Sequence, residues 1–346
     1  NALKKFGVPG QNIVYADVDG NIGWRPAVYI PIRKMGYSMV PRPGWDKSFE
    51  WSGYVPFEEM PYLYNPPEGY ISTANNKTIG NDFPYYISGL WADPSRSSRI
   101  KEVLEGDKKY SLEDMKALQL DLTSNYSKEI LPFILKNTGN YQNPIYERAI
   151  KFLKDWNHIE SIDSEGTLIF HSISNEIIRN IYYDELSVLG NKYFETYIGL
   201  KYITKRNLRR ILNSHTNKWV DDIRTPNKKE TIDEIITKSI ASGIQRVIDT
   251  YGPNWSNWKW GSAHSLIHKH ILGDVKILNY LYNLNIGPFL SGGSDVTPNA
   301  GGYSLHKGFK QTSGASMRRI VDFSDLNKTN MILPTGQSGL HDSPHY

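Results

Sequence analysis

A local signal for the fold is the stretch Tyr15-Ala16-Asp17-Val18-Asp19-Gly20-Asn21-Ile22-Gly23, which lies between two apolar runs. An Asp-Gly pair in such a place is a strong signal for a β-hairpin, because both residue types tolerate the backbone angles of a tight turn. The sequence therefore predicts a hairpin within residues 12–32. A calcium loop is the alternative, but its glycine would be the sixth residue rather than the fourth, and Val28 takes the place of the bidentate Glu.

Beyond this hairpin, the chain divides into three segments that differ in residue composition and in the secondary structure it predicts. Residues 1–100 are rich in Pro, Gly, Tyr and Trp, which predicts strands and long loops. Residues 101–284 predict a helical block, and residues 285–346 return to a texture of strands and loops. This order predicts an α+β fold in which the two outer segments share a sheet and the helices form an insertion or a layer.

The helical block opens with a capping signal. Ser111-Leu112-Glu113-Asp114 is similar to a capping box, in which the first and last side chains satisfy each other's backbone N–H groups. Apolar spacing and the Gly, Asn or Pro at their ends predict further helices at 146–156, 173–188, 194–213, 231–250 and 264–284. The apolar stripe that follows the capping signal consists of Leu118, Leu122, Ile130 and Leu131.

Composition excludes several classes of protein. The chain has 346 residues, with 40 Lys and Arg against 36 Asp and Glu, so its formal charge of +4 gives no reason to expect a nucleic-acid partner. It has no Cys, which excludes disulfides, thiolate zinc sites, iron–sulfur clusters and a Cys nucleophile within these residues. No run approaches 18 consecutive apolar residues, so no membrane span is expected.

Three clusters suggest chemistry but have simpler explanations. His264 and His268 are four residues apart and could share a helix face as zinc ligands, but the Glu of His-Glu-x-x-His is missing, which favours ordinary imidazoles. The basic residues 205–206 and 209–210 could bind an anion, but a solvated helix face is the preferred interpretation. The scattered Trp residues could form a sugar-binding platform, but large aromatic side chains more often serve a core.

Motifs along almost the whole chain resemble the large (β) subunit of the penicillin acylase family, within the N-terminal-nucleophile (Ntn) hydrolases. The first match is the hairpin stretch itself, which resembles the family's strand-turn-strand. The others follow in family order: Trp51-x-Gly53-x-x-Pro56-Phe57-Glu58-Glu59-Met60-Pro61, Asn65-Pro66, Gly69-Tyr70-Ile71-Ser72-Thr73-Ala74-Asn75-Asn76, Trp91 to Ile100, the Trp156 region, Trp260-Gly261-x-x-His264, Gly292-Gly293, Gly314-Ala315-Ser316-x-Arg318, Gly336-Gln337-Ser338-Gly339 and Ser343-Pro344-His345-Tyr346. Their joint order, rather than any single motif, carries the resemblance.

The resemblance implies a four-layer αββα sandwich and an autoprocessed amidohydrolase. In this family the β chain begins with a Ser, whose hydroxyl attacks the acyl carbon while its own α-amine, with a reference pKa near 8, acts as the base. The implied substrate is an N-acylated small molecule, such as a β-lactam with an amide side chain or an acyl-homoserine lactone.

Two residues of this sequence match family site residues. Asn75 matches the Asn whose side-chain amide stabilises the oxyanion of the tetrahedral intermediate. Arg96 matches an arginine that organises polar contacts at the active site. The alternatives are an ordinary loop asparagine for Asn75 and a salt bridge that holds the loop for Arg96. Asn76, if it lies on a strand, would point the other way and be structural.

The resemblance also implies partner chains. Asn1 cannot act as the nucleophile, so the match implies the C-terminal two thirds of a β subunit, with the rest of that subunit and a small α subunit from the same precursor as partners. The family often binds calcium, but the position of one of its carboxylate ligands falls near Tyr85–Tyr86 here, so no metal or other cofactor is expected.

Family members are commonly exported, which implies a periplasmic or extracellular location. The alternative is a non-catalytic homologue that serves as a binding or structural domain.

Overall fold

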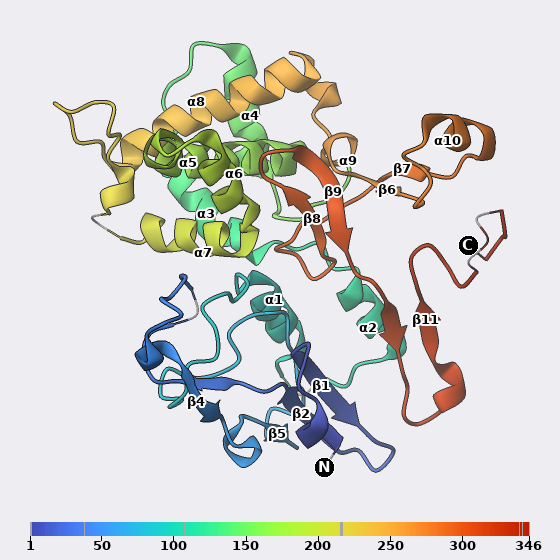
Figure 1. Ribbon diagram of the computed structural model, residues 1–346. Coiled ribbons are helices and arrows are strands. Elements are labelled where there is room, and N and C mark those ends of the chain that lie inside the picture. Colours follow the sequence, from blue (N-terminus) through green and yellow to red (C-terminus); the bar gives the residue numbers. More distant parts are fainter. Residues whose placement is uncertain are drawn as a thin grey trace.

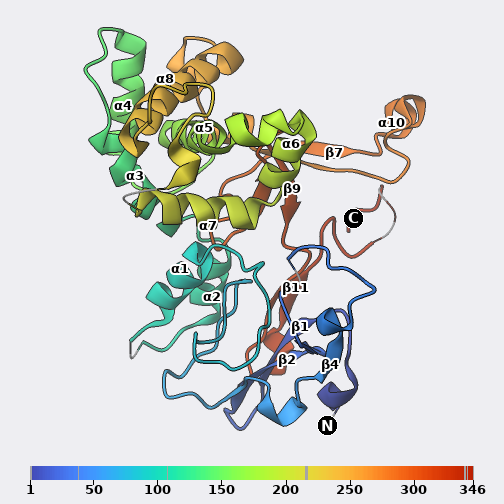
Figure 2. The same ribbon diagram turned by 60° about the vertical axis from the view of Figure 1, so that its left-hand side comes forward.

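The computed structural model describes residues 2–37, 39–106, 108–214, 217–338, 340 and 342–345. Asn1, and Gly339 and Tyr346 of the motifs above, lie outside the described residues. Helices and short strands are both present, and the predicted α+β class is confirmed. The helical block and the N-terminal strands lie at opposite ends of the molecule (Figures 1 and 2). None of the helices in the described part of the chain is long and apolar enough to cross a membrane.

The N-terminal segment forms short antiparallel sheets. Its strands are β1 (Gln11–Ala16), β2 (Ile22–Ala27), β3 (Pro31–Arg33), β4 (Trp51–Tyr54) and β5 (Leu63–Tyr64). The first sheet has the order β1-β2-β5, and β3 pairs with β4. A small buried apolar cluster of Ile30, Val55 and Met60 supports this segment.

The predicted hairpin is confirmed. β1 and β2 are antiparallel, with Val14 opposite Trp24, and the turn between them is the Asp-Gly stretch. Asp17 Oδ1 accepts hydrogen bonds from the backbone N–H groups of Asp19 at 3.0 Å and Asn21 at 2.9 Å, and Gly20 has a φ of +86°. The carboxylate therefore closes the turn, and the glycine supplies the left-handed backbone that other residues avoid.

The helical block contains the main core. Its helices are α1 (Ser95–Leu104), α2 (Leu112–Gln119), α3 (Asn125–Lys136), α4 (Pro144–Asp155), α5 (Glu165–Val188), α6 (Asn191–Gly199), α7 (Lys201–Leu212) and α8 (Ile232–Tyr251). α5 is buried on most of its surface and packs against α4, α6 and α8, so it forms the centre of the block. Ile169, Ile173, Ile177 and Ile181 of α5 are fully buried. A helix that is apolar on most sides is one that other helices surround.

The helix predictions are confirmed in part. Ser111 and Asp114 form the capping box at the start of α2. The apolar stripe does not lie on one helix: Leu118 is in α2, Leu122 is in the connection after it, and both are half-buried. Ile130 and Leu131 are buried in α3. The single helix expected over 194–213 is two helices, because the backbone leaves the helical conformation at Leu200, whose ψ is 55°.

The helix expected over 264–284 is wrong. This stretch begins just after α9 (Trp260–Ala263) and contains β6 (Ser265–His268) and α10 (Lys276–Tyr282). β6 pairs with β7 (Ile286–Leu290) in a projecting arm (Figure 1). Asn283, after α10, has a left-handed backbone with a φ of 47°, which reverses the chain towards β7. Pairing with residues 286–290 therefore outweighs the helical spacing of the apolar residues.

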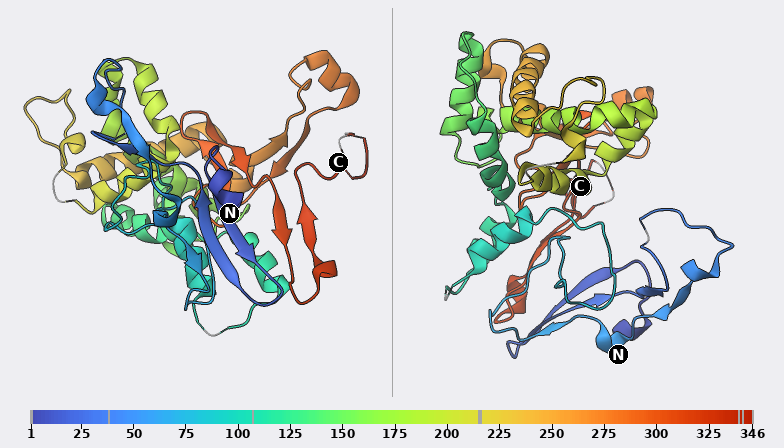
Figure 3. Two further views of the ribbon diagram at one scale, coloured as in Figure 1. Left: turned by 60° about the horizontal axis from the view of Figure 1, so that its bottom comes forward. Right: turned by 90° about the vertical axis from the view of Figure 1, so that its left-hand side faces the viewer.

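The expectation that the two outer segments share a sheet is also wrong for the described residues. β8 (Gly301–Ser304) pairs with β9 (Gly308–Gly314), and β10 (Arg318–Ile320) pairs with β11 (Asn330–Ile332). β10 and β11 lie at the same end of the molecule as β1 and β2 (Figure 3), but no ladder joins them within the part of the chain that the structure describes.

The contact between α5 and α8 depends on a glycine. A Cβ added at Gly243 of α8 would lie 2.8 Å from the Cα of Ile173 on α5, which is backbone and cannot rotate away. We expect Gly243→Ala to lower the free energy of unfolding by about 1–3 kcal/mol, because strain outweighs the gain in helix propensity. Urea unfolding followed by circular dichroism measures this. Gly199→Ala is the control, since a Cβ there has nothing within 4 Å; equal effects at both sites would contradict the packing argument.

Candidate active site

Asn75 lies in the long loop between β5 and α1, not on a strand. Its φ is 61°, a left-handed conformation that Asn adopts more readily than most residues. Its backbone carbonyl accepts a hydrogen bond from the N–H of Ala92 at 2.8 Å, which joins two parts of the loop. The backbone of Asn75 is therefore held in place while its side chain remains exposed.

Asn76 has a structural side chain, as expected, but it lies in a loop and not on a strand. Its Oδ1 accepts from the N–H of Ala74 at 3.0 Å, and its Nδ2 donates to the carbonyl of Lys77 at 3.0 Å. Both ends of this carboxamide close the local turn. The side chain of Asn76 is thus used within the loop rather than turned away by strand alternation.

Arg96 contacts the Asn75 turn directly. It lies in the first turn of α1, and its Nη2 donates to the carbonyl of Ala74 and to Oδ1 of Asn75, both at 2.8 Å. The two residues that the sequence singled out are thus neighbours in space, although 21 positions separate them. In the described residues Arg96 makes no salt bridge with a carboxylate, so the expected alternative of a plain salt bridge does not describe its contacts.

The contact with Arg96 fixes which way the carboxamide of Asn75 faces. A guanidinium can only donate, so the atom of Asn75 that faces it must be the oxygen. The Nδ2 group then points away from Arg96 with both of its N–H donors, and it has no hydrogen-bond partner within the described ranges. This arrangement can present a directed, uncharged donor to an oxygen atom of a bound molecule.

Helix α7 anchors the start of α1 from the other side. Arg209 Nη2 donates to Oδ1 of Asp93 at 3.1 Å and to Oγ of Ser95 at 2.9 Å, beside the N-terminus of α1. Arg206 donates to the carbonyls of Trp91 at 3.2 Å and Gly89 at 2.8 Å. These contacts hold residues 89–96, and with them Arg96, against the helical block.

The prediction of a solvated basic face on α7 is therefore wrong for three of its four residues, and only Arg210 is exposed. Lys205 is 3% exposed and forms a buried ion pair with Asp295, while Arg206 and Arg209 bind the loop. The spacing of 206 and 209 places both on one side of the helix, which is a signal that sequence analysis could have used. It could not show that the partner of that side is a loop of the same chain.

The buried pair of Lys205 and Asp295 joins α7 to the loop before β8. Burial raises the pKa of Asp295, but the nearby Lys205 ammonium more than offsets this, so the carboxyl pKa lies below its ordinary value. Beside the pair, the ring of His171 on α5 lies 3.1 Å from Glu160 and 3.0 Å from the hydroxyl of Tyr303 on β8. These polar contacts connect the helical block to the C-terminal strands.

Lys201 is a further cation close to Arg96 that sequence analysis missed. Its Nζ donates to Oγ of Ser313 on β9 at 3.1 Å. Burial lowers the pKa of Lys201, and the charges of Lys205 and Arg96 lower it further, against an opposing effect of Asp295.

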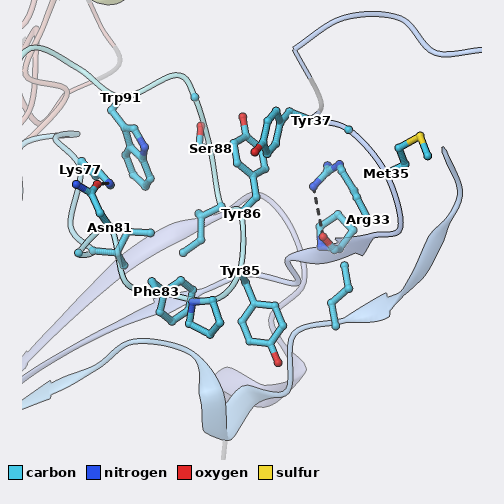
Figure 4. A pocket seen from close by; sticks show the side chains of 18 of the residues that line it. Arg33, Met35, Tyr37, Lys77, Asn81, Phe83, Tyr85, Tyr86, Ser88 and Trp91 are labelled. Carbon is cyan, nitrogen blue, oxygen red and sulfur yellow. Dashed lines mark hydrogen bonds between the residues drawn. The ribbon is translucent and has the colours of Figure 1, made fainter. Parts of the chain in front are cut away.

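A cavity of about 840 Å³ lies beside the Asn75 loop (Figure 4). Residues 31–37, which include β3, and residues 77–91 of the loop form most of its lining, and Arg206 also lines it. Aromatic and basic side chains both line it: Tyr37 and Tyr86 are in contact, with ring centroids 4.5 Å apart, and Trp91 and Arg33 line the same space. A concave space with both aromatic and polar groups suits an organic ligand.

His264 and His268, for which a zinc pair was the alternative to ordinary imidazoles, do not lie on one helix face. His264 follows α9, stacks on Trp260 at 4.7 Å between ring centroids, and its Nδ1 lies 2.6 Å from the carbonyl of Phe309. His268 is in the strand β6, so the two rings do not share a helix face. Within the residues that the structure places, no group of three or more His, Asp or Glu side chains is arranged to hold a metal ion.

Comparison with solved structures shows what the fold is similar to. A thermostable penicillin G acylase from Alcaligenes faecalis matches with a TM-score of 0.52, over 71% of this chain and 48% of that chain, at 19% identity. The matched part of this chain therefore has a fold similar to that of a penicillin G acylase.

The chain belongs to the penicillin amidase family, whose model matches residues 1–346. The penicillin acylase 2 proenzyme of Pseudomonas sp. (strain SE83) is 35% identical over 353 residues, which are 100% of this chain and 43% of that protein. The acyl-homoserine lactone acylase QuiP of Pseudomonas fluorescens is 28% identical over 363 residues, which are 100% of this chain and 42% of that protein. The chain thus spans less than half the length of these relatives.

Proposed function

We propose that this chain is part of an amidohydrolase that cleaves the amide of an N-acylated small molecule. Family membership supports amide hydrolysis, and the names of the relatives point to acyl-homoserine lactones and penicillins as the candidate substrates. The observation that carries the proposal is the hydrogen bond between Arg96 and Asn75 Oδ1, because it leaves Nδ2 of Asn75 as an oriented donor in an exposed position.

In the proposed reaction, a Ser hydroxyl attacks the acyl carbon and its proton passes to the Ser α-amine. The carbonyl oxygen becomes negatively charged, and Asn75 Nδ2 donates a hydrogen bond to it. Collapse of the intermediate breaks the C–N bond, and the amine departs with a proton. Water then attacks the acyl–enzyme ester and releases the acid. A donor that is already oriented stabilises the transition state without reorganising during the reaction.

Arg96 is a positioning residue in this proposal. It does not touch the reacting atoms, but its guanidinium holds the acceptor end of the Asn75 carboxamide at 2.8 Å. Without that contact, the exposed side chain could rotate and present its oxygen instead of its N–H groups. Helix α7 supports the arrangement through the contacts of Arg206 and Arg209 with residues 89–96.

The nucleophile in this proposal is a Ser outside these 346 residues, at the N-terminus of the processed β chain. The test compares the complete, processed protein with the 346-residue chain on phenylacetyl and long-chain acyl p-nitroanilides. We expect the complete protein to release p-nitroaniline and the isolated chain to release none above the uncatalysed rate. Turnover by the isolated chain would contradict an external nucleophile, and an inert complete protein would contradict the amidohydrolase.

A further inference from the structure

A second cavity, of about 370 Å³, lies in the helical block. Its walls come from α5, α6 and α8, and from the turn between β8 and β9. No residue of α1 or of the Asn75 loop lines it, so it is separate from the candidate active site. Its volume falls in the range of about 300–1,000 Å³ that small-molecule sites occupy.

Glu176 of α5 offers a hydrogen-bond acceptor to this cavity. The residue is 6% exposed, and Arg246 of α8 binds only one of its oxygens: Nε and Nη2 of Arg246 lie 2.7 Å and 2.6 Å from Oε1. The other oxygen, Oε2, has no hydrogen-bond partner among the residues that the structure describes, and Glu176 lines the cavity. An ammonium group is the natural partner for a buried carboxylate oxygen of this kind.

Arg179 offers the complementary group three residues further along the same helix. The i, i+3 spacing places it on the same face of α5 as Glu176. Its guanidinium lies 4.4 Å from the ring centroid of Tyr183 and 5.6 Å from that of Phe194, and it has no hydrogen bond or ion pair within the described part of the chain. The aromatic contacts hold the guanidinium in place while its N–H donors remain available for a carboxylate.

Apolar side chains complete the cavity. The rings of Tyr183 and Phe194 are perpendicular, with centroids 5.0 Å apart, and Ile198, Val247 and Phe309 line the same space. Glu195 also lines it and adds a second carboxylate. Arg246 lines the cavity too, but its Nε and Nη2 are engaged by Oε1 of Glu176. The cavity thus combines carboxylate acceptors, the guanidinium of Arg179 and apolar side chains within a small volume.

We propose that this cavity binds a free α-amino acid with an apolar side chain. Its ammonium group would bind Oε2 of Glu176, its carboxylate would bind Arg179, and its side chain would pack on the apolar wall. An α-amino acid carries both charges on neighbouring groups, which matches a carboxylate and a guanidinium on one helix face. This inference does not rest on the proposed hydrolase.

Calorimetric titration of the complete protein with L-phenylalanine tests the proposal. We expect saturable binding, and binding about tenfold weaker or more for phenylalaninamide, which lacks the carboxylate, and for 3-phenylpropanoate, which lacks the ammonium group. Each analogue loses one charge-assisted hydrogen-bonding group, which accounts for a loss of that size. Absence of binding, or equal binding of all three compounds, would overturn the proposal.

Variants locate the binding. Arg179→Gln is expected to remove the preference for L-phenylalanine over phenylalaninamide, because the group that selects the carboxylate is gone. Lys192→Gln is the matched control, since Lys192 is an exposed cation of α6 outside the cavity, and its affinity should equal that of the wild type. An unchanged preference in Arg179→Gln would also overturn the proposal. Neither outcome depends on Asn75, so hydrolase activity is judged separately.

Discussion

Replacing Asn75 with glycine is expected to lower kcat of the complete enzyme about 10²–10³-fold, the loss seen when one oxyanion donor is removed. Glycine is chosen because it accepts the φ of 61° at this position without strain. Alanine would remove the same donor, but it would add the cost of a left-handed backbone. KM should change little, because the donor acts on charge that develops in the transition state. Steady-state hydrolysis of an acyl p-nitroanilide measures both constants.

Asn75→Asp is a second variant, which removes the N–H donor of the side chain but keeps the oxygen that Arg96 binds. Aspartate keeps the size of the side chain and an oxygen for Arg96 to hold, but it has no N–H to offer. We expect a loss at least as large as that of the glycine variant, since a carboxylate would also repel the oxyanion. A change of less than threefold in either variant would remove Asn75 from the proposed role.

Replacing Asp295 with asparagine is expected to lower the free energy of unfolding by about 3–5 kcal/mol, because it leaves a buried ammonium without a counter-charge. The side chain of Lys205 is 4% exposed and that of Asp295 is 7% exposed, so water cannot replace the lost partner. The shape of the residue is nearly unchanged, so the effect reports charge rather than packing. Urea unfolding followed by circular dichroism measures it.

An exposed ion pair on the same helical block provides the comparison. Lys151 and Asp155 of α4 lie 2.6 Å apart, and both side chains are 61% exposed. Asp155→Asn should change the free energy of unfolding by less than about 0.5 kcal/mol, as is usual for exposed helix pairs. If the two asparagine variants had the same effect, burial would not be what makes the Lys205–Asp295 pair important.

Local signals in the sequence predicted local structure well. The Asp-Gly turn between β1 and β2 and the capping box at Ser111 are both present, because each depends on residues within a few positions of one another. The α+β class also follows from texture, since the long helical run lies between two segments rich in strands and loops.

Predictions failed where contacts are made between distant parts of the chain. The stretch 264–284 has apolar residues at helical spacing, but β6 pairs with β7, and no propensity within the stretch shows that partner. The basic residues of α7 were expected in solvent, but Asp295 lies 90 positions from Lys205, and the loop that Arg206 binds lies more than 100 positions away. Burial of a charge depends on such a partner, so it cannot be inferred from the helix alone.

The candidate site was predicted in part: its residues were named from the sequence, but their contacts were not. No spacing rule connects Asn75 with Arg96, and the two were paired only through resemblance to a family. The structure adds the direction of the carboxamide, because a donor-only guanidinium faces its oxygen. It also adds the support of α7, which no motif had indicated.

The small apolar cluster of Ile30, Val55 and Met60 has a practical consequence for protein engineering. The loop with Asn75 belongs to the segment that this cluster supports, whereas the large core lies in the helical block. We therefore expect substitutions in residues 2–100 to have the larger effect on how long the candidate site stays folded at raised temperature. Loop prolines, cross-links and immobilisation points belong in that segment, because further reinforcement of the helices would protect a part that is already well packed.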